Sequence, residues 1–458
     1  MIKRSLILIF FLISFLCWSD THNAASASYA DVNAAVGDAI TGDLVVVPAG
    51  SETWDTQLLI TKGITLQGAG TGSTIITRGV ASSLIRIELT EDVPVRVTGF
   101  YLDSNGTTYS NIYVRGTTNN SFCSSQVRVD HCYFEEGSHS LYIHGWVEGV
   151  ADNNTFHNCS IAVMFYGDND NVWGRYFTGG VTAAGTSNAF FVEDNEIILG
   201  NVDVAEAIYH QCGARSVIRH NTFDAEACTS YYALWFDSHG NWPYYDPEGE
   251  NIFRGQPLIE VYENIVKAYS AYRLYNIRGG SLLIYNNTMT TLSGGCPGVT
   301  LQDEESWQTA IFDPLRESWP AQDQIMNTFI WGNTANGVAI IDATIDERDA
   351  EFIQKDRDYF IHAPESTGGH ESYTDRAGAS DTEPTNEDGD GTMIFTAEGA
   401  NAYYPYTPYT YPHPLRGYGG GEVDKMVMVL LSQIQIMPIF WALFSMWAYV
   451  VVRIVNKL

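Results

Sequence analysis

The sequence predicts an all-β protein whose strands wind into a parallel β-helix, a solenoid of stacked coils. A short motif recurs along the 458 residues: an apolar residue, an asparagine three positions later, and a second apolar residue two positions after that, as around Asn221 and Asn287. The surrounding segments are rich in Val, Ile, Tyr, Phe and Thr, which favour strands. Each repeat of a solenoid packs only on its neighbours, so a single body of this length is allowed.

The asparagine of the motif marks each coil. Successive positions lie 22, 41, 26, 43, 23 and 46 residues apart, and counting the long steps as two units gives a period of about 20 to 26. A coil of that length holds three short strands, stacked on the next coil at about 4.8 Å. We expect the asparagine at a bend between two strands, with hydrogen bonds to neighbouring coils and unusual backbone angles. The positions are Cys132, Asn154, Asn195, Asn221, Asn264, Asn287 and Asn333.

Two apolar columns flank these positions and are expected to fill the core. The column three residues before comprises Val129, Ala151, Val192, Ile218, Val261, Ile284 and Ile330. The column two residues after comprises Phe134, Phe156, Ile197, Phe223, Val266, Met289 and Ala335.

Residues 1–27 are predicted to be a cleaved secretory signal. Lys3 and Arg4 precede an apolar run that ends at Trp18, and Ala25 and Ala27 offer a small-residue cleavage site. Export permits disulfides, although the spacing of the cysteines selects no pairing. Six cysteines follow the signal: Cys123, Cys132, Cys159, Cys212, Cys228 and Cys296.

The next segment carries the patterns GDLVVVPAG, from Gly42, and KGITLQGAG, from Lys62. It resembles the start of the secreted right-handed parallel β-helix proteins of the pectate lyase-like superfamily. The resemblance covers residues 29–415 and implies a short amphipathic helix that caps the first coil, where a sheet edge would otherwise be open. One face of that helix would comprise Val32, Ala35, Val36, Ala39 and Ile40, with Gly42 as its stop.

The β-helix is expected over residues 28–364. An irregular acidic loop and a strap rich in proline and tyrosine follow over 365–416; the strap has too much proline for a central strand and is expected to pack back on the solenoid. After a linker over 417–425, residues 426–452 carry no charge and are long enough to span a bilayer. Arg453 and Lys457 follow, which predicts a cell-surface protein with its solenoid outside.

The net charge of −30 argues against nucleic acid and anionic membrane surfaces as partners. An anionic polysaccharide would need a divalent cation such as Ca²⁺ as a bridge. Asp130, Asp152 and Glu193 share an outward position before the asparagine, where they form either a solvated acidic stripe or a metal site.

A second set of polar and aromatic residues follows the next strand of several coils and predicts a groove that binds polysaccharide. Aromatic rings stack on sugar rings, and polar groups take the hydroxyls. The predicted substrate-binding residues are His144, Tyr166, His210, Trp235 and Trp242.

For a lyase acting on uronic acids, the chemistry needs a cation to neutralise the sugar carboxylate and a base to remove the adjacent proton. The candidate catalytic residues are His239 as base, with Arg219 or Arg254 stabilising the developing charge. Asp237, Glu260 and Glu206 are the candidate ligands of Ca²⁺. Since no catalytic signature is complete, the sequence leaves enzymatic activity open. The alternative is a non-catalytic surface adhesin or structural spike, and the sugar, disulfide pattern and oligomeric state stay open.

Overall fold

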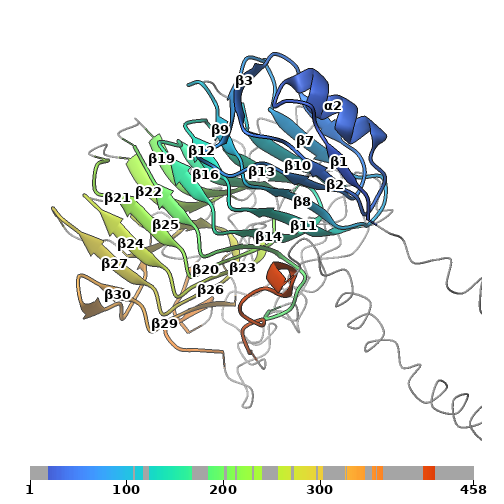
Figure 1. The fold of residues 1–458 in the computed structure, drawn as a ribbon. Helices are drawn as coiled ribbons and strands as arrows, with labels where there is room; N and C mark the ends of the chain where they lie inside the picture. The colour runs from blue at the N-terminus through green and yellow to red at the C-terminus, as the bar shows by residue number, and fades with distance from the viewer. Residues whose placement is uncertain are drawn as a thin grey trace, which may run out of the picture. The chain divides into compact units, whose positions relative to one another are not determined.

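A computed structural model gives the fold (Figure 1). The chain divides into two compact units, residues 1–409 and 410–458, and each is considered by itself. The described residues are 19–106, 109–116, 123–167, 184–200, 204–211, 214–228, 232–239, 256–269, 273–294, 298–302, 325, 327–345, 353–356, 358–364 and 406–417.

The first unit is a parallel β-helix, as predicted. Each coil passes through three sheets in turn, which we name A, B and C, and each strand pairs with the strand one coil away. All pairings are parallel except that of the last two strands of sheet B. A right-handed course is the rule for parallel crossovers of this kind. Sheet A comprises β1 (Thr21–Asn23), β2 (Leu44–Val46), β5 (Thr65–Gln67), β8 (Val95–Thr98), β11 (Ser124–Asp130), β14 (Val147–Asp152), β17 (Phe190–Glu193), β20 (Ser216–Arg219), β23 (Gln256–Tyr262), β26 (Gly280–Tyr285), β29 (Thr328–Trp331) and β33 (Tyr359–Phe360).

The other two sheets complete each coil. Sheet B comprises β3 (Gly50–Trp54), β6 (Thr74–Arg78), β9 (Tyr101–Asp103), β12 (Tyr133–Glu135), β15 (Thr155–His157), β18 (Glu196–Ile198), β21 (Thr222–Ala225), β24 (Ile265–Ala268), β27 (Thr288–Thr291), β30 (Thr334–Ala335) and β31 (Val338–Ala339). Sheet C comprises β4 (Leu58–Ile60), β7 (Ile85–Glu88), β10 (Ile112–Arg115), β13 (Leu141–His144), β16 (Ile161–Tyr166), β19 (Val204–Gln211), β22 (Tyr232–Ser238), β25 (Arg273–Arg278), β28 (Val299–Gln302) and β32 (Thr344–Ile345).

The predicted helix caps the first coil. Helix α2 (Tyr29–Asp38) begins after Ser28, whose side chain accepts a hydrogen bond from the Asp31 backbone, and it lies at the amino-terminal end of the stack (Figure 1). Its buried side chains are those of Val32, Ala35 and Val36. Ile40 was expected on the same face, but it follows the end of the helix and is exposed.

Residues before the helix belong to the fold. Strand β1 pairs with β2, His22 Nε2 lies 2.9 Å from Asp43 Oδ2, and Trp54 Nε1 donates to the Ala27 carbonyl at 3.0 Å. The predicted cleavage point after Ala27 therefore lies inside the folded body, and cutting there would remove an edge strand from sheet A.

We expect any processed form of the protein to begin at or before Asp20, because the pairing of β1 with β2 covers the end of the sheet. Amino-terminal sequencing of the mature protein purified from the cells that make it measures this directly. A mature terminus at Ser28 would contradict it.

The asparagines form a continuous ladder between sheets A and B, as predicted. In each coil the side-chain oxygen accepts from the backbone and side-chain amides of the preceding ladder residue, at 2.9 to 3.0 Å for Asn154 and Asn195. Each side-chain amide also donates to a carbonyl of the preceding coil, as Asn221 does to Val192 at 2.8 Å. Both predicted apolar columns point inward and are buried, with only Ala335 partly exposed.

The unusual backbone angles belong to the residue before each ladder position, not to the asparagine itself. These residues have φ between 52° and 57° at His131, Asn153, Asp194, His220, Glu263 and Asn286, and Gly332 has 67°. A single left-handed residue reverses the side-chain direction between the two strands and makes the bend tight.

The long steps between ladder positions are single coils, which corrects the count of two units per long step. Asn154 bonds directly to Asn195 across 41 residues, and β14 pairs directly with β17. The additional residues of these coils lie in the connections that follow sheet C.

Several predictions concern residues that fall partly or wholly outside this description. Among the described cysteines, Cys123, Cys132, Cys159 and Cys228 are free thiols. The predicted acidic loop, the transmembrane segment and all of the linker except Gly417 lie outside the described residues. Within the described part of the chain, no helix has the length and apolar character of a membrane span.

Part of the predicted strap contacts sheet A within the first unit. The Arg219 guanidinium donates to the Tyr409 carbonyl at 2.7 Å, and Tyr406 packs edge-on against Tyr285 and Trp331. In the second unit, the described residues end in a short 3-10 helix, η5 (Pro414–Gly417).

Candidate functional site

The outward face of sheet C, which we call the C face, collects side chains from successive coils. Alternate residues point inward and outward along each strand, so the outward ones line up in columns. One column contains Arg86, Tyr113, Tyr142, Met164, Tyr209, Asp237, Asn276 and Thr300. The other contains Glu88, Arg115, His144, Tyr166, Gln211, Arg278 and Gln302.

The amino-terminal half of the C face is aromatic and half-exposed. The ring centroids of Tyr113 and Tyr142 lie 5.0 Å apart, and those of His144 and Tyr166 also lie 5.0 Å apart. The Tyr113 hydroxyl contacts His144 Nδ1, and the guanidinium of Arg86 lies 5.3 Å from the Tyr113 ring. Two predicted substrate-binding residues, His144 and Tyr166, are thus brought together.

The carboxyl-terminal half of the C face holds a group that we call the polar cluster: Asp237, His239, Asn276 and Arg278. Asp237 Oδ1 accepts from Asn276 at 2.8 Å, and its Oδ2 lies 2.9 Å from His239 Nε2 and 3.2 Å from Arg278 Nη2. The cluster is buried, and the Tyr209 ring lies 5.0 Å from that of His239.

Two carboxyl groups in this region have pKa values displaced in opposite directions. Burial alone would raise the pKa of Asp237, but the Arg278 guanidinium, His239 and Asn276 hold it below its usual range. Burial and the charge of Asp237 raise the pKa of Glu206 to about 8. Near neutral pH, Asp237 is therefore an anion and Glu206 a neutral acid, a division that suits proton transfer.

The raised pKa of Glu206 predicts a pH-dependent stability. Between the ordinary pKa of 4.5 and about 8 the folded protein keeps a proton that the unfolded chain has lost, so the free energy of unfolding falls as the pH rises through this range. Urea unfolding of wild type and Glu206→Gln at pH 5 and pH 8 measures the effect. We expect a smaller fall for Glu206→Gln; identical pH dependences would contradict this assignment.

His210, a third predicted substrate-binding residue, points into the core instead. It is fully buried, its Nε2 lies 2.5 Å from Ser216 Oγ, and its ring stacks on Phe165 at 4.7 Å. Burial lowers the pKa of His210 to about 3. Because side chains alternate along a strand, Tyr209 takes the outward place that was assigned to His210.

Two other candidates lie on sheet A, away from the polar cluster. Arg219 forms a fully buried ion pair with Glu193, 2.6 Å between Nη2 and Oε2. Glu260 is also fully buried and accepts from Arg215 at 2.5 Å, the Gly185 backbone at 3.1 Å and the Tyr406 hydroxyl at 2.8 Å. Neither residue shares a sheet with His239.

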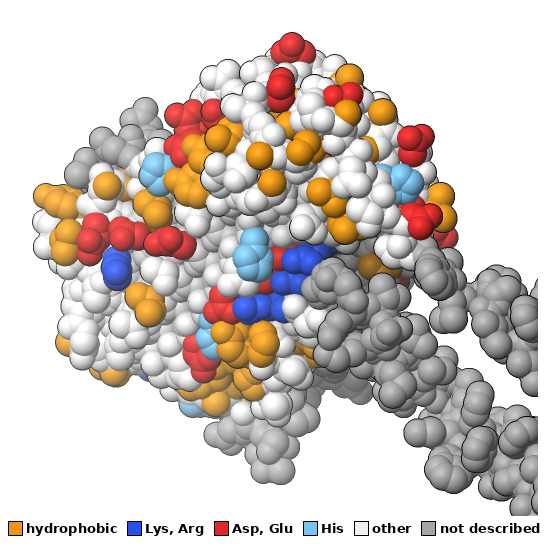
Figure 2. Space-filling model, viewed as in Figure 1, with side chains coloured by type: hydrophobic (Ala, Val, Ile, Leu, Met, Phe, Trp, Pro, Cys, Tyr) orange, Lys and Arg blue, Asp and Glu red, His pale blue; other side chains and the backbone are white. Residues whose placement is uncertain are grey.

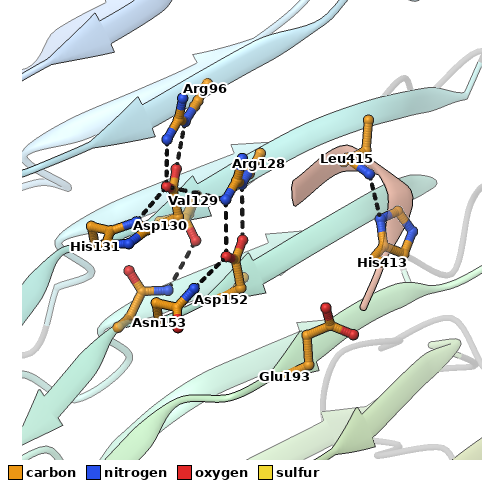
Figure 3. Close-up of polar contacts among 12 residues, drawn as sticks. Arg96, Arg128, Val129, Asp130, His131, Asp152, Asn153, Glu193, His413 and Leu415 are labelled. Carbon is orange, nitrogen blue, oxygen red and sulfur yellow. Dashed lines mark hydrogen bonds and ion pairs between the residues drawn. The ribbon is translucent and has the colours of Figure 1, made fainter. Parts of the chain in front are cut away.

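The acidic stripe of the sequence is in adjacent coils and is paired with arginines. Arg96 binds Asp130 at 2.6 Å, and Arg128 binds Asp152 at 2.9 Å and Asp130 at 3.3 Å (Figure 3). Figure 2 shows acidic and basic side chains gathered side by side over this region. The carboxylates are buried, so the stripe is not solvated, and arginines take the places that a metal ion would need.

The remaining candidates cannot be placed. Arg254 and Trp242 lie outside the described residues, and Trp235 lies in β22 without a described side chain.

The predicted calcium ligands do not converge. Glu260 is on sheet A, whereas Asp237 and Glu206 are on strands of sheet C. Both Asp237 oxygens already take hydrogen bonds, and the Arg278 guanidinium beside them disfavours a divalent cation. Among the residues that the structure describes, no group of three or more His, Cys, Asp or Glu could hold a metal ion.

No protein-family model matches the sequence, and no curated protein matches it. Solved structures with a similar fold include the A-module of mannuronan C-5 epimerase AlgE4 from Azotobacter vinelandii, at 14% identity over 69% of this chain and 88% of that one, with a TM-score of 0.34. Another is a mannuronic acid specific family 6 polysaccharide lyase from human gut microbiota, at 12% identity over 77% and 89%, with a TM-score of 0.35.

A third is the PL6 family alginate lyase AlyGC, at 13% identity over 84% of this chain, with a TM-score of 0.35. This chain spans 59% of that lyase's length. The β-helix expected from the opening sequence is confirmed by the strand pairing of the structure itself, in which three sheets are stacked coil on coil.

Sequence reasoning missed Arg278 and Asn276. Asn276 is 39 residues from Asp237, and Arg278 is 41. The sequence gives one signal. Asn276 and Arg278 follow the motif asparagine Asn264 by 12 and 14 residues, and Asp237 follows Asn221 by 16 residues.

Proposed function

We propose that the C face binds polysaccharide and that the polar cluster cleaves uronate-containing chains by β-elimination. The observation that supports this most is the alignment, on one face, of half-exposed aromatic rings with a cluster of a carboxylate, a histidine and an arginine. Rings provide stacking surfaces for sugars, and the cluster supplies a proton acceptor and a positive charge.

The charges of the C face suit an anionic sugar despite the acidity of the whole chain. Glu88 is paired with Arg86 at 2.8 Å, and Asp237 is paired with His239 and Arg278. Arg86 and Arg278 therefore offset the charges of these two carboxylates, which lowers the repulsion that a polyuronate meets beside them.

The test incubates the full-length protein with alginate, polygalacturonate and neutral polymers and follows the ultraviolet absorbance of unsaturated products. We expect product from at least one uronate polymer and from none of the neutral ones. His239→Gln should abolish turnover, whereas His131→Gln, which changes an exposed histidine at the bend between sheets A and B, should retain it. Absence of both product and binding across the panel would reject the proposal.

A non-catalytic adhesin is the second candidate, and one observation favours it. Asp237 is 0% exposed and His239 4%, so a substrate has little access to the polar cluster as it stands. Such a protein would bind polysaccharide through the aromatic half of the C face without releasing product. Retained binding with no product, and loss of binding in Tyr142→Ala, would support the adhesin.

The described residues do not test the calcium cofactor expected from the sequence, and the polar cluster favours turnover without it. Because Arg278 already places a positive charge in the polar cluster, we expect turnover in excess EDTA to stay within about twofold of turnover with Ca²⁺. The same absorbance assay measures it. A loss of about a hundredfold or more, restored by Ca²⁺, would instead assign the charge-neutralising role to a metal.

A further inference from the structure

Both nitrogens of the His239 ring are engaged in the polar cluster. Nδ1 lies 3.0 Å from Arg278 Nη1, and Nε2 lies 2.9 Å from Asp237 Oδ2. An arginine side chain has only donors, so Nδ1 must accept the hydrogen bond. The tautomer assigned by these partners therefore carries its proton on Nε2 and donates it to Asp237.

This arrangement blocks the role of base that His239 has in the proposed reaction. The lone pair that would take the substrate proton is the one on Nδ1, and Arg278 occupies it. An imidazolium is also excluded in this geometry, because its Nδ1 proton would face an arginine N–H. The protein therefore has the base in place but not available.

The lone pair on His239 Nδ1 becomes available only if Arg278 moves to another partner. Its guanidinium divides its donors between His239 Nδ1 at 3.0 Å and Asp237 Oδ2 at 3.2 Å. The planar fork of an arginine fits a carboxylate with two parallel hydrogen bonds, which are stronger than a single bond to a neutral ring nitrogen. A sugar carboxylate on the C face is thus a better partner for Arg278 than His239 is.

We propose that Arg278 makes the base conditional on an anionic substrate: a uronate carboxylate takes over the guanidinium, and His239 Nδ1 becomes free to accept a proton. This inference rests on the proposed function and names the substrate feature that starts the reaction. A neutral sugar leaves the hydrogen bond from Arg278 to His239 intact, so it can bind without being cleaved.

The elimination then balances without an oxidant or a reductant. His239 Nδ1 takes the proton from the carbon that bears the carboxylate, and the electron pair of that C–H bond forms a carbon–carbon double bond. The bond from the adjacent carbon to the glycosidic oxygen breaks, and its electron pair stays on that oxygen, which takes a proton from water. The hydroxide left behind recovers the proton from His239, and Arg278 returns to Nδ1.

The first test uses spectra of the full-length protein labelled with ¹⁵N-histidine, with the His239 signals assigned through His239→Gln. Galacturonate, glucuronate and mannuronate are added, each against its neutral counterpart galactose, glucose or mannose, none of which has a glycosidic bond to cleave. We expect the Nε2-protonated tautomer in the free protein and a shift of the Nδ1 signal with a uronate only. A bound uronate that leaves the Nδ1 signal in place would overturn the inference.

The second test is kinetic and uses a matched control. The amide of Gln can still donate to His239 Nδ1 but has no charge that a carboxylate would draw away, so Arg278→Gln should lower kcat for a uronate polymer by about a hundredfold. KM should rise as well, because the guanidinium that pairs with the sugar carboxylate is lost. Lys267→Gln, which removes a positive charge from sheet B, should leave both constants unchanged. Unchanged kcat in Arg278→Gln would contradict the inference while wild-type turnover still supports the proposed function.

The two proposals fail differently. If the wild-type protein neither binds nor cleaves any uronate, the proposed function itself is wrong. If Arg278→Gln does not fold, the spectra of the wild-type protein still decide, because they require no variant at position 278.

Discussion

Replacing Asn221 with alanine is expected to lower the free energy of unfolding by about 4 kcal/mol, because several buried hydrogen-bonding groups lose their partner at once. Its side-chain oxygen accepts from the backbone and side-chain amides of Asn195, both at 3.0 Å. Its own amide donates to the carbonyls of Val192 at 2.8 Å and Arg219 at 2.9 Å. All of these groups are buried, so none regains a partner from water.

Urea unfolding of wild type and Asn221→Ala measures the loss. Asn188→Ala provides the control, because Asn188 is an exposed asparagine in the same sheet region and its loss should cost less than about 0.5 kcal/mol. A difference below about 1 kcal/mol for Asn221→Ala would mean that the ladder is not a main source of stability.

Arg219→Met is expected to cost about 3 to 5 kcal/mol, because it leaves the Glu193 carboxylate buried without its cation. Both side chains of this pair are 0% exposed, and the Arg219 guanidinium also lies 4.9 Å from the Phe191 ring. Replacing both charges should be far milder than replacing one, since two apolar side chains of similar volume need no counter-charge.

The double variant Glu193→Met with Arg219→Met is therefore expected to be more stable than either single variant. A double-mutant cycle of unfolding free energies gives the coupling between the two positions. Additive losses would show that the pair does not act as a unit. Reduced turnover by Arg219→Met without any loss of stability would restore the catalytic role that the sequence suggested for this residue.

The sequence was enough to predict the coil, the inward columns and the asparagine ladder because these depend on local alternation and on a repeated motif. It could not separate a long connection from an additional coil. Asn154 and Asn195 have the same direct hydrogen bond as Asn264 and Asn287, although their separations in the chain are 41 and 23 residues. Only the register of the strands settles which coils are neighbours.

The site was harder to predict because the three sheets look alike in sequence. Arg219 and Glu260 are polar, outward residues near the right place in the chain, but they belong to sheet A and are held by Glu193 and Arg215. His210 was predicted to point outward, but in a strand the side chains alternate, so its neighbour Tyr209 points outward and His210 points into the core. Asp237 and His239 were found because they lie close together at the end of one strand, β22.

The bend between sheets A and B is short and tied by the ladder, while the segments that follow sheet C, such as 167–189, 239–255 and 303–327, vary widely in length. A lineage can therefore lengthen, shorten or exchange these segments without disturbing the amide bonding that defines the solenoid. Novelty in recognition would accumulate in these connections, and an engineer grafting new loops has the same freedom there.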